Sequence, residues 1–267
     1  MSGNPPTILV FDSGVGGLTV LAPIRAARPD AKYIYVGDTA CFPYGELPEQ
    51  TLIERVTSVI TEMAERFQPD LIVIACHTAS TLVLPELRAT LSIPIIGTVP
   101  AIKPAAEQSK SKLISVLATQ GTVKRDYTAS LIRDFAGECD VTLVSARLLA
   151  GQAEAVLRGE TVDDAAILQE IVPAFVAKAD QKTDCIVLAC THYPLLLAAF
   201  QRVAPWPVTW IDPAPAIARR VVHLLGEAKA DTATPHQGLV LLTDEASWTK
   251  ALESAFREYG LVRLNGT

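Results

Sequence analysis

Two stretches of the chain are near copies of one another, and each ends in a cysteine followed by polar residues. DLIVIACHTAS spans Asp70 to Ser80, DCIVLACTHYP spans Asp184 to Pro194, and both contain the pattern D-x-I-V-x-A-C. The short continuous apolar run in each predicts a strand buried on both faces, as in a parallel sheet covered by helices. The repeat therefore predicts two similar lobes, each with a cysteine at the carboxyl end of a strand.

Apolar runs and helical patterns alternate along the whole chain, which is typical of βαβ units. The first part gives strands at 8–11, 33–36 and 71–75, with helices from about 18, from about 48 and at 81–91. The second part gives strands at 113–117, 141–145 and 186–189, with helices at about 123–135, 161–179 and 195–203. We expect an α/β fold of two pseudo-symmetric lobes, each a mostly parallel sheet covered by helices, with the active site at the lobe interface.

Proline-containing segments mark the expected lobe boundaries. The segment from Pro94 to Pro104 is the expected crossover into the second lobe, and the stretch around Trp206 is the expected return. We expect residues 1–98 together with 210–267 to form the first lobe, and residues 99–209 to form the second.

Composition and charge restrict the class of protein. Of the 267 residues 49% are hydrophobic, but no apolar run reaches the roughly 18 residues that a membrane-spanning helix needs, and the chain start lacks the features of a signal peptide. Five cysteines without a CxxC pair indicate a reducing compartment, and a net charge of −6 argues against a nucleic-acid groove. We therefore expect a cytoplasmic protein with a small-molecule substrate and no membrane association, and we expect a homodimer.

Cys76 and Cys190, at the two matched strand ends, are the first candidates for chemistry. A lone strand-end cysteine is most often core filler, and Cys185, which has no polar followers, serves as the comparison. Two equivalent cysteines suit a reaction with two faces, because inversion of a carbon centre by proton transfer needs a base on one side and an acid on the other. His192 would bias the thiolate fraction of Cys190 or relay its proton, unless it is only a hydrogen-bonded strand-end residue.

The stretch FDSGVGG, residues 11–17, places an acid and a hydroxyl on a glycine-rich turn after the first strand. Such turns bind anions through backbone N–H groups and the helix dipole, although this one lacks the Walker lysine and the G-x-G-x-x-G pattern. An N-cap by Ser13 is equally compatible with the sequence. Asp12 would hold a substrate ammonium group or polarise a thiol.

Three further features could belong to a functional site, but each also has an alternative interpretation. Tyr44 and Gly45 follow the second strand and would border the cleft, but a Pro-Tyr-Gly surface turn explains them equally well. Glu154 lies in an amphipathic helical stretch, where a solvated face is the default interpretation. A zinc site has suitable ligand types in Cys76, His77, Cys190 and His192, yet adjacent ligands at a strand end make joint coordination awkward, so we expect no metal.

The chain resembles the glutamate racemase family, within the cofactor-independent aspartate/glutamate racemase superfamily. The resemblance covers most of the length through FDSGVGGLTVL, YVGDTACFPYG, ACHTAST, GTVPAIKPA, LATQGTV, LACTHYPLL and IDPA, in the family's order. It implies two α/β lobes with the active site between them, no cofactor, and Cys76 and Cys190 as the paired proton donor and acceptor. It also implies substrate contacts from Asp12, Ser13, Tyr44, Gly45, Thr78, Thr191 and His192.

The resemblance further implies that Glu154, across a one-residue offset, and His192 assist one half-reaction. The chain departs from the family pattern at His77, where Asn is usual, and near Cys41, where a basic residue is common. His77 would still hydrogen-bond a substrate carboxylate. The implied function is supply of D-glutamate for peptidoglycan. The alternatives are another acidic amino acid such as aspartate, a decarboxylase or other isomerase of the superfamily, and a non-catalytic binding protein for an acidic metabolite.

Overall fold

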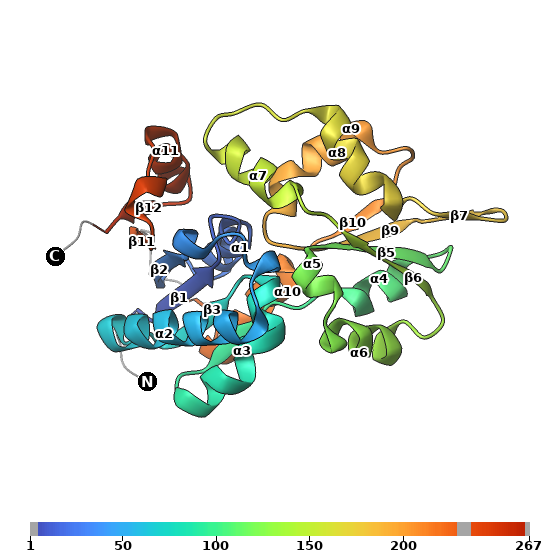
Figure 1. Cartoon of the computed structure of the whole chain (residues 1–267). Helices are drawn as coiled ribbons and strands as arrows, with labels where there is room; N and C mark the ends of the chain where they lie inside the picture. Colours follow the sequence, from blue (N-terminus) through green and yellow to red (C-terminus); the bar gives the residue numbers. More distant parts are fainter. Residues whose placement is uncertain (1–4, 229–235, 265–267) are drawn as a thin grey trace.

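The computed structural model describes residues 5–228 and 236–264, which form two lobes side by side (Figure 1). Each lobe is a parallel sheet with helices on both faces, so the expected α/β class with two lobes is confirmed. Within these residues, no helix combines the length and apolar character needed to cross a membrane.

The first lobe contains the first and the last strand of the described residues. Its strands are β1 (Thr7–Asp12), β2 (Lys32–Gly37), β3 (Leu71–Ile74), β4 (Ile95–Gly97), β11 (Gly238–Leu242) and β12 (Leu261–Arg263). They form one sheet in the order β12-β11-β2-β1-β3-β4. Its helices are α1 (Leu18–Ala27), α2 (Glu49–Phe67), α3 (His77–Thr90), α10 (Ala214–Leu225) and α11 (Lys250–Glu258).

Side chains of β1 alternate between two hydrophobic cores, one on each face of the sheet. Ile8 and Val10 face the core built with α1, α10 and α11, while Leu9 and Phe11 face the core built with α2 and α3. Because both faces of the strand are buried, its sequence is continuously apolar rather than alternating.

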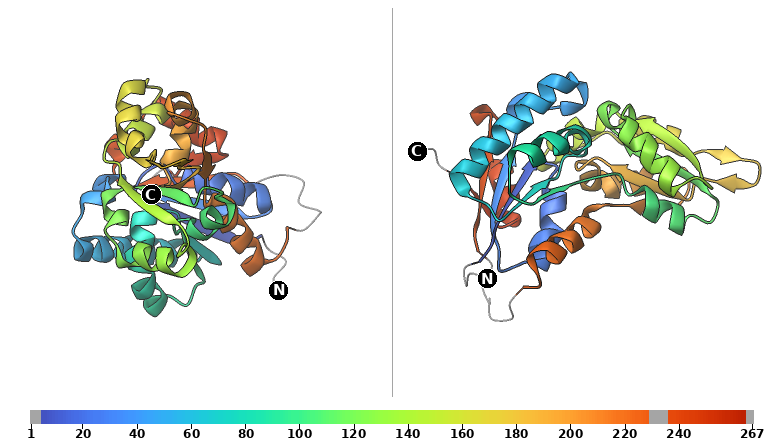
Figure 2. Two further views of the ribbon diagram at one scale, coloured as in Figure 1. Left: turned by 90° about the vertical axis from the view of Figure 1, so that its right-hand side faces the viewer. Right: turned by 90° about the horizontal axis from the view of Figure 1, so that it is seen from below.

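The second lobe has strands β5 (Leu113–Ala118), β6 (Asp140–Ser145), β9 (Cys185–Ala189) and β10 (Thr209–Ile211), in the sheet order β10-β9-β5-β6. Its helices are α4 (Ile102–Gln108), α5 (Gln120–Val123), α6 (Asp126–Phe135), α7 (Leu149–Leu157), α8 (Asp164–Ile171) and α9 (Leu197–Val203). A short antiparallel hairpin, β7 (Ala177–Lys178) and β8 (Gln181–Lys182), projects away from the first lobe (Figures 1 and 2).

The two sheets share one topology. In the first, β1 pairs with β2 on one side and β3 on the other; in the second, β5 pairs with β6 on one side and β9 on the other. Strand order therefore reverses between β1 and β3 and between β5 and β9, and such reversals are where open parallel sheets bind ligands.

Several expected element bounds are wrong for local reasons. The helix expected at 81–91 begins at His77, because Cys76 serves as its N-cap. The helix expected at 161–179 ends at Ile171, since Pro173 lacks the N–H that a continuing helix needs. The helix expected at 123–135 is divided between α5 and α6, where Arg125 is extended. The second sheet extends through β10 to Ile211, one residue past the start expected for the returning first-lobe segment.

Candidate active site

Cys76 and Cys190 follow equivalent strands, β3 and β9, in opposite lobes. Asp12 ends β1 and Thr119 follows β5, so each point of strand reversal is flanked by one cysteine and one oxygen-bearing residue. The repeat in the sequence therefore corresponds to a repeat in space.

A small cavity between the lobes contains both cysteines. Its volume is about 20 Å³, which is room for about one water molecule. A molecule the size of an amino acid exceeds this volume, so the cavity must widen to admit one. The cavity is lined by residues of both lobes: Ser13, Phe42, Pro43, Tyr44, Gly45, Cys76, His77, Thr78, Thr119, Ala150, Cys190, Thr191 and His192.

Cys76 is a buried thiol at the N-terminus of α3. Its Sγ donates to Ser13 Oγ at 3.5 Å, and the backbone N–H of Ala79 hydrogen-bonds the sulfur. Burial, together with the charge of Asp12, raises the pKa of Cys76 to about 12 despite these two hydrogen bonds. Cys76 is thus protonated at neutral pH, which suits a proton donor.

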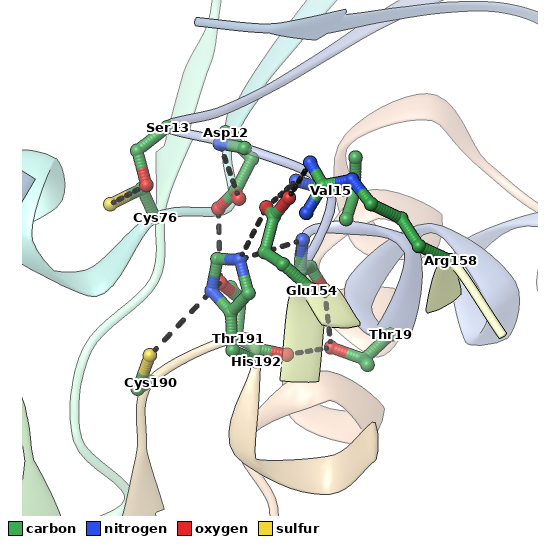
Figure 3. Close-up of polar contacts among 12 residues, drawn as sticks. Asp12, Ser13, Val15, Thr19, Cys76, Glu154, Arg158, Cys190, Thr191 and His192 are labelled. Atoms are coloured by element: carbon green, nitrogen blue, oxygen red, sulfur yellow. Dashed lines mark hydrogen bonds and ion pairs between the residues drawn. The ribbon is translucent and has the colours of Figure 1, made fainter. Parts of the chain in front are cut away.

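His192 connects Cys190 to a buried carboxylate (Figure 3). Its Nδ1 lies 3.8 Å from Cys190 Sγ, and its Nε2 lies 3.1 Å from Glu154 Oε1. Burial alone would lower the pKa of His192, but hydrogen bonds to Cys190 and Glu154, with the charges of Cys190 and Asp12, raise it well above its ordinary value. An imidazolium therefore lies beside the sulfur of Cys190.

Glu154 is 3% exposed, so the default interpretation of a solvated helix face is wrong. Burial alone would raise the pKa of Glu154, but His192, the N–H of Val15 and the charge of Arg158 lower it below its ordinary value. Arg158 donates from Nη2 to Glu154 Oε2 at 2.8 Å. The carboxylate is thus ionised and held by groups from both lobes.

The glycine-rich turn after β1 binds the carboxylate of Glu154, an anion of the protein itself. Val15 donates its N–H to Glu154 at 2.9 Å, and the backbone nitrogen of Gly16 lies 3.2 Å from His192 Nε2. A Cβ on Gly14 would lie 2.3 Å from Glu154 Oε1, and one on Gly16 would lie 2.4 Å from the His192 ring, so only glycine permits this approach. Nε2 consequently has a donor nearby when it is unprotonated and an acceptor nearby when it is protonated.

The alternative role for Ser13 as a helix N-cap is wrong. Gly17 is the N-cap of α1, and no side chain caps it. The Ser13 hydroxyl instead accepts from Cys76.

Asp12 is fully buried behind the cavity wall. Its Oδ1 accepts from Thr191 Oγ1 at 3.0 Å, and its Oδ2 accepts from the N–H of Gly14 at 3.1 Å. Burial raises the pKa of Asp12, and the charge of His192 and these hydrogen bonds offset only part of that rise. Asp12 and Glu154 are not among the described residues that line the cavity, but they contact two that do, Thr191 and His192.

Thr78 closes the opposite side of the cavity. Its hydroxyl lies 2.9 Å from that of Thr119 and 3.3 Å from that of Thr122, both in the second lobe. An ion pair between Arg125 and Glu49 joins the lobes nearby. These contacts hold the lobes together where Thr78 lines the cavity.

Tyr44 is a buried wall of the cavity, not part of a surface turn. It is 2% exposed, and its hydroxyl donates to Asp38 at 2.5 Å. Asp38 also accepts from Arg55 at 2.9 and 2.5 Å and from Thr243 at 2.6 Å. Gly45 lies beside Tyr44 and also lines the cavity.

His77 lines the cavity at the first position of α3 and is 2% exposed. Neither ring nitrogen has a hydrogen-bond partner among the described residues. Burial lowers the pKa of His77 to about 3, so the ring is neutral. A buried imidazole without partners costs free energy that a bound polar group would recover.

The four residues considered as a zinc site, Cys76, His77, Cys190 and His192, all line the cavity. Across residues 5–228 and 236–264, no group of three or more His, Cys, Asp or Glu side chains is arranged to hold a metal ion.

Sequence reasoning missed several residues of the site. Arg158 was detectable as the residue four positions after Glu154 on one helix, a spacing that brings side chains together. Thr119 was detectable from the match between the starts of the two lobes, where it corresponds to Ser13. Phe42 lies against the ring of His192, with 5.4 Å between ring centroids, and no local pattern indicated this contact.

A family model described as Asp/Glu/Hydantoin racemase matches residues 19–221. A glutamate racemase of Brucella anthropi is 50% identical over 255 residues, which cover 95% of this chain and 92% of that protein. A glutamate racemase of Brucella canis is 55% identical over 219 residues, which cover 82% and 79% of the two chains. The crystal structure of Escherichia coli glutamate racemase, in complex with L-glutamate and the activator UDP-MurNAc-Ala, matches with a TM-score of 0.86 and 40% identity, over 97% of this chain and 98% of that one.

Proposed function

The chain belongs to the Asp/Glu/hydantoin racemase family, in which its matched relatives are glutamate racemases, and on this premise we propose that it interconverts L- and D-glutamate by proton transfer between two thiols. The family expected from the sequence motifs is confirmed. One observation carries the proposed mechanism: Cys76 and Cys190, from equivalent strands of opposite lobes, line a single cavity.

Each direction of the reaction uses the thiols in opposite roles. In one direction, Cys190 as thiolate removes the α-proton and becomes a thiol, while Cys76 gives its proton to the opposite face of the carbanion and becomes a thiolate. The reverse direction exchanges these roles. The protonated state of Cys76 and the imidazolium beside Cys190 support this assignment, because a nearby cation stabilises negative charge on sulfur.

The weak acidity of the α-carbon is the main chemical obstacle. Donors fixed in advance around a site that excludes water are an effective way to stabilise carbanion charge. The cavity has room for about one water molecule. Thr78 and backbone N–H groups around the cavity are the proposed donors, while Thr191, whose hydroxyl hydrogen goes to Asp12, offers the substrate an acceptor oxygen. Asp12 acts behind Thr191, which donates to it.

Glutamate is the proposed substrate, and His77 is its proposed contact in place of the family's usual Asn. A neutral imidazole with both nitrogens unpartnered among the described residues can donate to a substrate carboxylate. Ser13, Tyr44 and Gly45 complete the proposed binding set on the first-lobe side. Aspartate is the alternative substrate, because its carboxylates offer the same hydrogen-bonding groups.

We further propose that the enzyme supplies D-glutamate for peptidoglycan and works in the cytoplasm as a homodimer. All five cysteines are free thiols, which supports a reducing compartment. Exposed apolar side chains on the second lobe, Tyr127, Phe135 and Leu143, support self-association. Sedimentation velocity tests the dimer, since a single monomeric species at micromolar concentration would exclude it.

Solvent deuterium incorporation tests the proposed activity. The protein is incubated in D₂O with L-glutamate and, separately, with D-glutamate. Proton NMR follows loss of the α-hydrogen signal, and circular dichroism follows the ratio of the enantiomers. We expect deuterium in the product enantiomer from either start. Exchange with aspartate alone would reassign the substrate. Binding of glutamate without any exchange would instead identify a non-catalytic binding protein.

A further inference from the structure

Arg158 lies immediately behind the pair formed by Glu154 and His192. It follows Glu154 by one helical turn at the end of α7, and its guanidinium donates to Oε2 at 2.8 Å. The other oxygen, Oε1, accepts from Val15 N–H and lies against His192 Nε2. Figure 3 shows Arg158 reaching the carboxylate from the side away from Cys76 and Cys190.

The surroundings of Glu154 require a permanent positive charge. Glu154 is 3% exposed, whereas the side chain of Arg158 is 30% exposed and connects the buried carboxylate to solvent. A buried carboxylate without a counter-charge takes up a proton. His192 supplies a counter-charge only while it is protonated, but a guanidinium stays charged at every relevant pH.

The end of α7 is also fixed across the lobe boundary. Leu157, between Glu154 and Arg158, packs against the first-lobe core formed with α1, α10 and α11. Arg158 therefore caps a helix whose end is anchored in the first-lobe core.

We infer that Arg158 is a positioning residue for the proposed racemisation: it orients Glu154 and keeps the proton of the His192–Glu154 pair on the imidazole, beside Cys190. This inference rests on the proposed function. Among the described contacts, Arg158 touches neither the cavity lining nor either thiol. It acts only through Glu154.

Other charged and titratable groups also face the pair. Cys190 and Asp12 act on His192, and Tyr35 lies within electrostatic range of Glu154. An Arg158 variant leaves all of them in place. Removing one positive charge stabilises the protonated form of every group nearby. The loss of Arg158 therefore raises the pKa of these groups, and most of all that of Glu154, which it contacts.

The test compares Arg158→Met and Arg158→Lys with the wild type. We expect Arg158→Met to lower kcat/KM for glutamate about tenfold at pH 7 through lost orientation. Both limbs of its kcat/KM pH profile should move to higher pH by about 0.5 unit, the size of a partly exposed ion pair. Arg158→Lys keeps the charge and should restore the profile. Arg202→Met, which removes a surface ion pair with Asp164, is the matched control and should change neither quantity.

An independent readout separates this inference from the proposed function. In protein labelled with ¹³C-histidine, the His192 signal, assigned with His192→Asn, should shift toward the neutral imidazole at pH 7 in Arg158→Met, because Glu154, the group nearest to the lost charge, then holds more of the shared proton. A wild-type profile and a wild-type His192 signal in Arg158→Met would overturn the inference while racemisation stands. An equal loss of activity from Arg158→Met in a Glu154→Gln background would also overturn it, because Arg158 would then act without Glu154. Absence of racemisation in the wild type would overturn the proposed function instead, and the His192 signal would still decide the coupling.

Discussion

The backbone nitrogen of Gly16 lies 3.2 Å from Nε2 of His192, across the boundary between the lobes. A methyl group on Gly16 would meet the imidazole ring at 2.4 to 2.7 Å. Gly16→Ala should therefore displace His192 and lower kcat by about 100-fold. Gly151→Ala, in α7 with open space around its Cβ, is the control and should retain activity. Normal activity in Gly16→Ala would show that this contact is dispensable.

Glu154→Gln should destabilise the protein in a pH-dependent way. The folded-state pKa of Glu154 is lowered, so its contribution to stability is present above its unfolded pKa and is lost as pH falls through the folded value. At pH 7 we expect the free energy of unfolding to fall by about 2 kcal/mol, as for a buried hydrogen-bonded charge. Urea denaturation between pH 3 and pH 8 measures this loss, which should shrink below about pH 4. A loss independent of pH would argue against an ionised Glu154.

His77 offers a test in which stability and binding change in opposite directions. His77→Leu removes two buried nitrogens without partners among the described residues, so we expect the free energy of unfolding to rise by about 1 kcal/mol. The same variant should raise the KM for glutamate at least several-fold, because the proposed carboxylate contact is lost. His77→Asn, which restores the usual family residue, should keep glutamate turnover. Thermal unfolding and initial rates with glutamate and aspartate measure both effects. An unchanged KM in His77→Leu would remove His77 from the substrate site.

Tyr44→Phe tests the loop that follows β2. The variant removes the hydroxyl that donates to Asp38 but leaves Arg55 and Thr243 as partners of that carboxylate. We expect a loss of about 1 kcal/mol in the free energy of unfolding, the net worth of one hydrogen bond. We also expect a smaller change in kcat than in KM, because Tyr44 forms the cavity wall. Tyr127→Phe, at an exposed tyrosine on α6, is the matched control. Equal effects of the two variants would contradict a specific role for the Asp38 network.

The sequence predicted the fold class and the placement of both cysteines because these depend on local patterns. Strand hydrophobicity is continuous where both faces are buried. In each copy of the repeat, Cys76 or Cys190 comes at the end of the apolar run that predicts the strand. The boundaries of α3 and α8 were not predictable to the residue, since polar residues after Cys76 resemble a loop and the helical pattern expected over 161–179 continues past Pro173. Contacts between lobes were the hardest part. Val15 and Gly16 contact Glu154 and His192 because of how the two sheets are placed relative to one another. No short stretch of sequence predicts that placement.

The measurement that tests the paired thiols most directly uses Cys76→Ala and Cys190→Ala with both glutamate enantiomers in D₂O. Because enantiomers have equal free energies, kcat/KM must be the same in both directions for any variant that turns over, which provides an internal check. We expect each substitution to abolish racemisation while leaving the fold intact, since each face of the stereocentre loses its acid or base. Racemisation at the wild-type rate by either variant would contradict the two-thiol account.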